Sequence, residues 1–418
     1  MKILICPNAY PPQTGRAARS VQLHVDQLRS LGHQTLVVVP ESDGAPAVQD
    51  GVIHLPAFHG FPPSDLAVLP PALETALCEF EPDVIHAHHP LLLGGVALRI
   101  ADLRKSPLVF THHMRCECGV QQGPFDSPVI QRLFSDLVTR YSNMCDAVVV
   151  PTQRTAAMLR QQGVTSAVTI IPTGAETERF VQGEAEQMRA EFGIPQDAFV
   201  VGLAADGGDS RWPTVLTEAI SSFLTRDRRA HLLLFARDRA EMPLGPRLRS
   251  PQLRVRAHCI ECHREAELRA AYAAMDVLAA CGQRRQDRHA LVEALSAGVP
   301  VIAIEDPDSR ELVQDGKNGR LLPQLDAGAL AAALEWVPNL GSSERIAMHA
   351  AIHATAQRLT LRESALRMTE LYRHLIEQRK TRSAQAREAP SAALGWVDEE
   401  IKILSNMAGA LSDALLRA

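Results

Sequence analysis

Short apolar runs alternate with helical segments along almost the whole of this chain, and no other feature limits its fold as strongly. The first run, Lys2–Cys6, is rich in aliphatic side chains. After it, Val21, Val25 and Leu28 fall at helical spacing, and Gly32 marks a helix end. Parallel strands need long crossover connections, which helices usually supply. The alternation therefore predicts an α/β protein whose parallel sheets are covered by helices.

The same pattern gives two series of strands, one in each half of the chain. The first series is expected at Lys2–Cys6, Thr35–Val39, Asp83–His86, Pro107–Phe110, Ala147–Val150 and Val168–Ile171. The second series is expected at Phe199–Leu203, His231–Phe235, Leu253–Arg256, Val277–Ala280 and Val299–Ile302. A chain of 418 residues exceeds a single hydrophobic core, so the two series predict two Rossmann-like domains.

Changes in composition indicate where these domains begin and end. A polar stretch without a strand pattern separates the two series, which places the first boundary near residue 185. The sequence thus predicts an N-terminal domain over 1–185 and a second domain over 186–342. Helices are expected over 343–380, crossing back to the first domain. Residues 381–418 are expected to form a linker and an amphipathic tail helix.

Net charge and the distribution of apolar residues indicate which partners and which cellular location to expect. The formal net charge of −5 does not favour nucleic-acid binding, which usually shows as a basic domain. No apolar run reaches the length that spans a bilayer. The first residues lack a charged region, a long apolar region and a cleavage site, so we expect a cytoplasmic protein.

A compact group of metal-binding residue types occurs in the second half, where His258, Cys259, Cys262 and His263 lie close together. Zinc binding by the two cysteines and a histidine is one alternative. The usual second pair of ligands is not nearby in sequence, which favours a loop with incidental thiols. We therefore predict no metal site.

Three blocks of the first half place polar residues directly after predicted strands. They are residues 10–15, YPPQTG, residues 82–90, PDVIHAHHP, and residues 107–113, PLVFTHH. A glycine-containing loop between a strand and a helix presents N–H groups that suit a phosphate. A histidine at the carboxyl end of a strand lies where open α/β sheets bind ligands. We attribute the histidines of the second block to packing and loop hydrogen bonds rather than to a metal.

The second half carries two further blocks. In residues 289–303, HALVEALSAGVPVIA, an apolar helix pattern holds one acid, Glu293, and then breaks at a glycine before a β-branched strand. Residues 311–319, ELVQDGKNG, begin with Glu311. The blocks of both halves, in this order, resemble glycosyltransferase family 4. The resemblance implies a GT-B fold, in which two Rossmann-like domains face a cleft and C-terminal helices follow.

The resemblance also implies roles for individual residues. It places His113 beside the transferred sugar, as the candidate catalytic residue. It assigns binding of the sugar donor to Arg211, Glu293 and Glu311. The loop that contains Gly15 and Arg16 is expected to face a phosphate or the acceptor. A metal and a cofactor are not expected, because the nucleotide sugar is a co-substrate.

Four positions depart from the family pattern on the donor side. Arg285 stands where the family has its first acid, eight residues before Glu293. Asp206 replaces a cation that would neutralise the leaving diphosphate. Arg288 and Asp308 each stand where the family has a glycine. Together they indicate either a changed donor or lost catalysis.

These observations support three hypotheses of function. The first is a retaining glycosyltransferase that moves a hexose from a nucleotide sugar to a lipid or glycan acceptor. The second is a non-catalytic binding or scaffolding protein of the same family that has lost donor-site residues. The third is a GT-B enzyme for another activated sugar or phosphate ester. Since the 82–90 and 107–113 blocks look closest to enzymes that glycosylate lipids, we also expect peripheral contact with the inner membrane face.

Overall fold

Packing divides the chain into two compact units. Unit 1 holds the described residues of Met1–Thr173 and Ser364–Ala418, and unit 2 consists of Gly174–Glu363. The structure is a computed structural model, and it describes residues 1–10, 16–40, 48–49, 51–55, 71–90, 93–113, 128–175, 184–205, 214–236, 247–262, 264–280 and 287–386.

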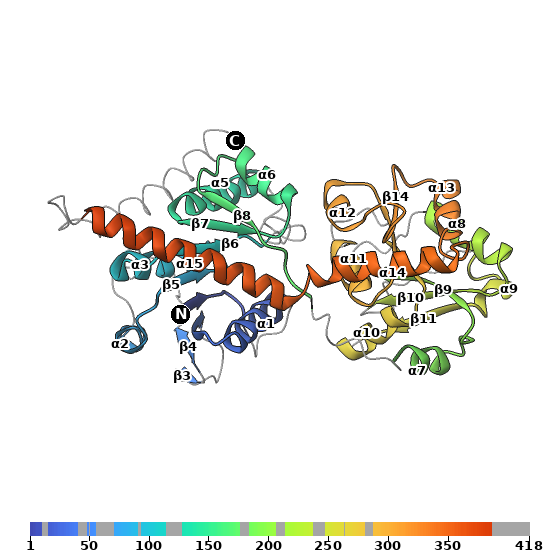
Figure 1. The fold of residues 1–418 in the computed structure, drawn as a ribbon, viewed down its shortest axis with the longest axis horizontal. Coiled ribbons are helices and arrows are strands. Elements are labelled where there is room, and N and C mark those ends of the chain that lie inside the picture. The colour runs from blue at the N-terminus through green and yellow to red at the C-terminus, as the bar shows by residue number, and fades with distance from the viewer. Residues whose placement is uncertain are drawn as a thin grey trace. The chain divides into compact units, whose positions relative to one another are not determined.

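Unit 1 is built on a single sheet with the strand order β3-β4-β2-β1-β5-β6-β7-β8 (Figure 1). All neighbouring strands are parallel except β3 and β4, which form a short antiparallel pair. The strands are β1 (Lys2–Cys6), β2 (Gln34–Pro40), β3 (Val48–Gln49), β4 (Val52–Leu55), β5 (Val84–Ala87), β6 (Leu108–Thr111), β7 (Ala147–Val150) and β8 (Ala167–Ile170).

Helices cover both faces of this sheet. One face packs against α1 (Arg16–Ser30) and α15 (Leu361–Ala386), which is drawn in red along the unit in Figure 1. The other face packs against α2 (Pro71–Phe80), α3 (Leu93–Arg104), α5 (Pro128–Met144) and α6 (Gln153–Gln161).

Period-two alternation along β1 shows how one strand serves both cores. Ile3 and Ile5 lie in the core under α1 and α15, whereas Leu4 and Cys6 lie in the opposite core. All four side chains are fully buried. A strand buried on both faces reads as a continuous apolar run, which is why the sequence predicted β1 at its observed bounds. The predicted stop of α1 is also confirmed, because Gly32 takes a φ of 84°, which favours glycine.

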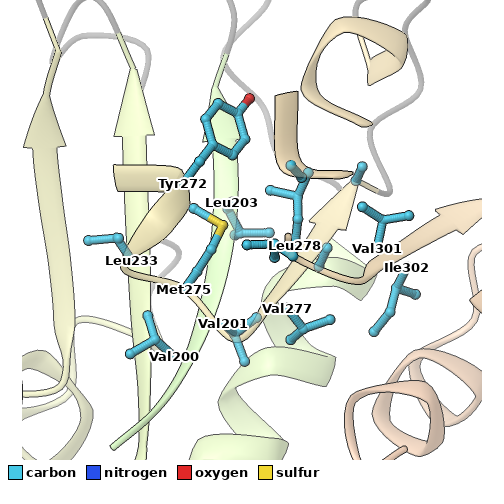
Figure 2. Close-up of a cluster of buried hydrophobic side chains, with 14 of the residues drawn as sticks. Val200, Val201, Leu203, Leu233, Tyr272, Met275, Val277, Leu278, Val301 and Ile302 are labelled. Atoms are coloured by element: carbon cyan, nitrogen blue, oxygen red, sulfur yellow. The ribbon is translucent and has the colours of Figure 1, made fainter. Parts of the chain in front are cut away.

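Unit 2 contains a parallel sheet with the order β11-β10-β9-β12-β13-β14. Its strands are β9 (Phe199–Ala205), β10 (Ala230–Ala236), β11 (Ala257–Glu261), β12 (Val277–Ala280), β13 (Val301–Ile304) and β14 (Gly319–Leu322). Its helices are α7 (Glu184–Glu191), α8 (Thr214–Arg226), α9 (Pro251–Arg254), α10 (Glu265–Ala273), α11 (Asp287–Ser296), α12 (Pro307–Leu312), α13 (Ala327–Leu334) and α14 (Ser342–Gln357). Figure 2 shows the central packing of this sheet, where Met275 and Tyr272 lie among apolar side chains of β9, β10 and β12.

The fold class and most predicted strands are confirmed, and two local predictions are wrong. Residues Leu253–Arg256 do not form a strand, because α9 covers Pro251–Arg254 and the strand begins only at Ala257. Pro251 takes the first helical position, where its fixed φ favours a helix. A linker does not begin at residue 381, since α15 continues to Ala386 through alanine, arginine and glutamine, which are strong helix formers.

The two connections between the units run side by side. Ala175 forms an isolated parallel bridge with Thr360, and its N–H donates to the carbonyl of Leu359 over 2.7 Å. A Cβ on Gly174 would collide with the backbone of Leu361, so only glycine fits there. Packing thus places the division at Thr173 and Gly174, earlier than the predicted boundary near residue 185. Of the two helices predicted to cross back, α15 belongs almost wholly to unit 1 and α14 to unit 2.

The predicted tail helix after residue 396 lies outside the described residues. Over the ranges that the structure describes, no helix is both long enough and apolar enough to cross a bilayer.

Candidate functional site

Unit 1 has a topological switch point between β1 and β5. From β1 the chain continues outward through β2, and from β5 it continues in the opposite direction through β6 and β7 to β8. Ligands of open α/β sheets bind outside the carboxyl ends of the strands at such a point. The polar side chains that follow β5 and β6 are therefore the first candidates for a site in this unit.

Strand alternation brings four of these side chains to one face of the sheet. His86 and His88 lie on the same face as Val84, which packs in the core under α1 and α15. Thr111 and His113 reach the same place from the neighbouring strand β6. The members of each pair are two positions apart along the chain, so both side chains of a pair point the same way.

His86 is fully buried and uses both ring nitrogens. Its Nδ1 lies 2.6 Å from the hydroxyl oxygen of Tyr372, and its Nε2 lies 2.6 Å from Oγ1 of Thr111. Tyr372 comes from α15, 286 residues further along the chain. Because both nitrogens are paired, the ring avoids the cost of burying an unsatisfied polar group. His86 is thus a fixed support within the core.

Two more imidazole rings extend from His86 towards the end of the sheet. The ring of His88 stacks on His86 with 4.2 Å between centroids. Nδ1 of His88 lies 2.9 Å from Nε2 of His113, and the centroids of these two rings are 5.2 Å apart. His24 of α1 meets His86 edge-on at 6.1 Å. We call His24, His86, His88 and His113 the imidazole array.

The imidazole array is uncharged at neutral pH. Burial lowers the pKa of His24 from 6.5 to about 4. Burial, followed by the fields of neighbouring histidines, lowers the pKa of His113 from 6.5 to about 4. The same causes hold the pKa values of His86 and His88 well below 6.5. Each ring therefore offers one N–H donor and one lone pair.

Sequence reasoning identified His113 but gave His88 only a packing role, and it did not identify Tyr372 as a partner. The structure places His88 in direct hydrogen-bond contact with His113. A signal for this pair existed in the i, i+2 spacing on each of two neighbouring parallel strands. No local signal marked Tyr372, whose role depends on where α15 packs.

The second switch point lies between β9 and β12 in unit 2. The helix α11 follows β12, and it carries Glu293, which is half-buried. The helix α12 follows β13 in the same way and carries Glu311. Both predicted donor-binding acids therefore lie on helices that begin beyond the carboxyl ends of β12 and β13.

Arg288 of α11 links these two helices. Its Nη1 lies 3.4 Å from Oε2 of Glu311 and donates to the backbone carbonyl of Asp308 over 3.1 Å. The side chains of the ion pair are 16% and 22% exposed. Burial lowers the pKa of Arg288, and the carboxylates of Glu311 and Asp308 oppose this shift. An arginine where the family pattern has a glycine thus engages one of the predicted donor-binding acids.

Five of the residues named in the sequence analysis lie outside the described residues: Gly15, Asp206, Arg211, His263 and Arg285. Arg16 is the first residue of α1, but its side chain lies outside the description as well.

The predicted loop of incidental thiols is in fact partly a strand. His258 and Cys259 belong to β11, and Cys262 directly follows it. Nε2 of His258 lies 3.0 Å from Nδ1 of His231 on β10, and the rings stack within 7° of parallel. Within the described ranges, no group of three or more histidine, cysteine or acidic side chains is arranged to hold a metal ion.

Two family models match this chain, one in each half. The model described as Glycosyltransferase Family 4 covers residues 17–179, and that described as Glycosyl transferases group 1 covers residues 201–338. The chain belongs to glycosyltransferase family 4. His86, His88 and His113 lie within the range matched by the first model. Arg288, Glu293 and Glu311 lie within the range matched by the second.

Curated relatives match the glycosyltransferase chain over most of their length. A GDP-mannose-dependent alpha-mannosyltransferase of Mycobacterium tuberculosis is 26% identical over 77% of this chain and 84% of its own length. An alpha-monoglucosyldiacylglycerol synthase of Acholeplasma laidlawii is 24% identical over 76% and 84%. Among solved structures, Anabaena HepE in complex with UDP matches with a TM-score of 0.63 at 18% identity, covering 89% of this chain and 99% of HepE. The fold is GT-B.

Proposed function

We propose that this protein is a retaining glycosyltransferase that moves a hexose from a nucleotide sugar to a lipid or glycan acceptor. The imidazole array is the observation that carries the proposal. It presents His113, the residue that the family pattern places beside the transferred sugar, at the carboxyl ends of β5 and β6. A neutral imidazole there can hydrogen-bond a sugar hydroxyl without the cost of burying a charge.

Donor binding is assigned to unit 2 in this proposal. Glu293 would accept hydrogen bonds from the two ribose hydroxyls, as a carboxylate with four lone-pair sites can. Arg211 would neutralise the diphosphate, and Glu311 would complete the donor site. On the side of unit 1, Gly15 and Arg16 would face a phosphate or the acceptor. Relatives and structural neighbours whose names include GDP-mannose or UDP support a nucleotide sugar as the donor.

The transfer exchanges one C–O bond for another. The bond between the anomeric carbon and the donor phosphate oxygen breaks, and the nucleoside diphosphate leaves with the bonding electrons. The acceptor hydroxyl oxygen forms the new bond on the same face. Its proton passes to the departing phosphate, so the protein needs no separate general base for this step. Groups that stabilise the leaving phosphate then contribute most to the rate.

The acceptor in this proposal is a lipid or a glycan. The relative named as a synthase of a glucosylated diacylglycerol supports a lipid. A lipid acceptor would bring the cytoplasmic protein to the inner membrane face, as a peripheral contact.

The ion pair between Arg288 and Glu311 favours a second candidate, a non-catalytic member of the family. Glu311 already has a cationic partner within the protein, and that partner stands in place of a glycine. A donor phosphate approaching α12 would meet a side chain where close approach to backbone is expected. Such a protein would bind an acceptor without transferring a sugar.

One experiment separates the candidates. The purified full chain is incubated with radiolabelled UDP-glucose, UDP-galactose or GDP-mannose and with vesicles of diacylglycerol or phosphatidylinositol. Product is extracted, and its anomeric configuration is read by NMR. Transfer with retained configuration supports the enzyme. If the chain binds vesicles but neither transfers sugar nor binds nucleotide, the result supports the non-catalytic protein. A product with inverted configuration contradicts the retaining mechanism.

A further inference from the structure

In the contact between His88 and His113, one of two ring nitrogens must carry the shared proton. Nδ1 of His88 and Nε2 of His113 are 2.9 Å apart, which is a hydrogen bond. Both rings are neutral, so one nitrogen of this pair carries the proton and the other accepts it. Only two arrangements exist. They present opposite chemistry at Nδ1 of His113, the ring nitrogen that this hydrogen bond leaves for a ligand.

The other nitrogen of His88 decides between the two arrangements. Nε2 of His88 is buried, and among the described residues it has no hydrogen-bond partner. If His113 donated, His88 would carry its own proton on this Nε2, leaving a buried N–H without an acceptor. If His88 donates from Nδ1, its Nε2 is a bare lone pair. An orphaned N–H is rarer in buried sites than an under-used acceptor, which favours donation by His88.

We propose that His88 is a positioning residue that donates from Nδ1 to Nε2 of His113 and thereby fixes the proton of His113 on Nδ1. His113 then meets its ligand as a hydrogen-bond donor and not as a base. The ligand it fits is an oxygen with a free lone pair, such as a hydroxyl of the donor hexose. This role of His113 rests on the proposed transfer function, whereas the proton placement does not.

The rest of the imidazole array holds His88 in the required plane. His86 stacks on it at 4.2 Å and is itself held by Tyr372 and Thr111 through two hydrogen bonds of 2.6 Å. The support beneath His88 therefore comes from three elements, namely β5, β6 and α15. A ring held in this way keeps one orientation, so Nδ1 of His88 continues to point towards Nε2 of His113.

A donor at this place complements the chemistry of the transfer. In the proposed reaction the acceptor proton passes to the departing phosphate, so a base at His113 has no proton to remove. A donor, in contrast, orients the sugar by bonding to one of its hydroxyl oxygens. Its pKa of about 4 keeps His113 neutral, so the ring positions the sugar without adding a positive charge beside it.

The proton placement can be read directly by NMR on the full chain. In protein labelled with ¹⁵N-histidine, ring nitrogens that carry a proton and those that do not have well-separated shifts. The signals of His113 are assigned from their loss in His113→Gln. We expect a protonated Nδ1 and a bare Nε2. The reverse pattern, or an average of both, would overturn the proposal whether or not the protein transfers sugar.

Two substitutions of similar size test the role of His88. In His88→Asn the side-chain amide can donate from nearly the place of Nδ1, whereas His88→Leu fills the space without a donor. We expect His88→Leu to lower kcat roughly 10- to 100-fold with a smaller change in KM for the nucleotide sugar, and to mix the His113 tautomers. His88→Asn should restore both the tautomer and most of kcat.

A matched control uses the stacked pair His231 and His258 in unit 2. His258→Asn and His258→Leu alter the same kind of contact, 3.0 Å between nitrogens, on β10 and β11. They should leave the His113 signals and kcat unchanged. Equal loss of kcat in both His88 variants, with the wild-type tautomer retained in both, would show that His88 only packs. If the natural chain shows the expected tautomer of His113 but no transfer activity, the pairing of His88 with His113 is supported and the proposed enzymatic function is contradicted.

Discussion

Each unit of this glycosyltransferase has a sheet with a central switch point, but the side chains around the two switch points differ in their chemistry. In unit 1, neutral imidazoles and hydroxyls lie in the core, and His86 is fully buried with both nitrogens paired. In unit 2, the corresponding helices carry charged side chains, and Arg288 and Glu311 stay 16% and 22% exposed. Neutral groups can be buried once they are hydrogen-bonded, whereas buried charges pay a desolvation penalty that pairing only partly offsets.

Topology therefore sets the place of a site, whereas the side chains around it set its chemistry. The four departures on the donor side fall in unit 2, while the imidazole array in unit 1 is organised by the hydrogen bonds of His86 and His88. A variant in unit 1 should therefore disturb an organised polar cluster. A variant in unit 2 should mainly change how a charged ligand is held.

The largest effect is expected for His113. His113→Ala removes the proposed donor to the sugar and should lower kcat about 10²-fold, because the sugar is no longer oriented at the reacting centre. Glu311→Gln in unit 2 should lower kcat much less, since Arg288 already engages that acid. Initial rates of transfer at saturating nucleotide sugar would check both. Equal losses in the two variants would contradict the distinction between the units.

Acid should destabilise unit 1 strongly. The pKa values of His24 and His113 are lowered to about 4, so these rings favour the folded state only while they are neutral. Their contribution is complete above pH 6.5 and is lost as the pH falls from about 6.5 towards 4. Each can contribute up to about 3 kcal/mol, since one pKa unit is worth about 1.4 kcal/mol.

Hydrogen exchange followed by mass spectrometry would test this window. Between pH 7 and pH 5, after correction for intrinsic exchange, protection of β5 and β6 should fall. In unit 2, only β10 and β11, which carry His231 and His258, should respond, because the pKa values of both are lowered by burial. Unchanged protection of β5 and β6 would show that the array is not held neutral by the fold.

Nucleotide affinity should depend mainly on unit 2. Glu293→Gln removes a charge-assisted acceptor for ribose hydroxyls and should weaken nucleotide binding by roughly 1.5–3 kcal/mol. Isothermal calorimetry with UDP and GDP on the folded variant would measure it. His88→Leu serves as the control and should bind nucleotide as the natural chain does. An unchanged affinity in Glu293→Gln would remove Glu293 from the site.

The hydroxyl of Tyr372 links α15 to the array, and its loss should have a moderate effect. Tyr372→Phe leaves Nδ1 of His86 without its buried partner and should lower the free energy of unfolding by about 1–2 kcal/mol. Urea titration followed by circular dichroism would measure this change. Leu366→Ala, at an exposed position of the same helix, is the control and should cost less.

The smallest effect is expected for the ion pair of unit 2. Arg288→Met breaks a mostly buried contact with a long N–O distance, 3.4 Å, together with the hydrogen bond to the carbonyl of Asp308, and should change stability by about 1 kcal/mol. If Arg288 shields Glu311 from a ligand, the same variant should change nucleotide affinity more than it changes stability. Calorimetry and urea titration on one preparation would compare the two, and a large loss of stability alone would make Arg288 a structural residue.

Much of the fold could be predicted because strands buried on both faces leave a strong local pattern. β1, β7 and β12 begin and end where the apolar runs predicted. The prediction failed at Leu253–Arg256, where an alternating pattern lies in a helix that Pro251 starts. Polar composition also predicted too early a linker, because the polar end of a helix resembles a loop in composition. Hydrophobic periodicity arises from burial of one face, so it predicts secondary structure poorly where a segment buries no face.

The α/β class, the family and the place of His113 at a strand end follow from the amino-acid sequence, because they depend on local periodicity and on motifs. The sequence could also have paired His88 with His113, since i, i+2 spacing on neighbouring parallel strands puts them on one face. The contacts of Tyr372 with His86 and of Arg288 with Glu311, in contrast, are seen only in the folded chain. Those contacts depend on how distant helices pack, and the long range of that packing leaves no mark in the local pattern of side chains.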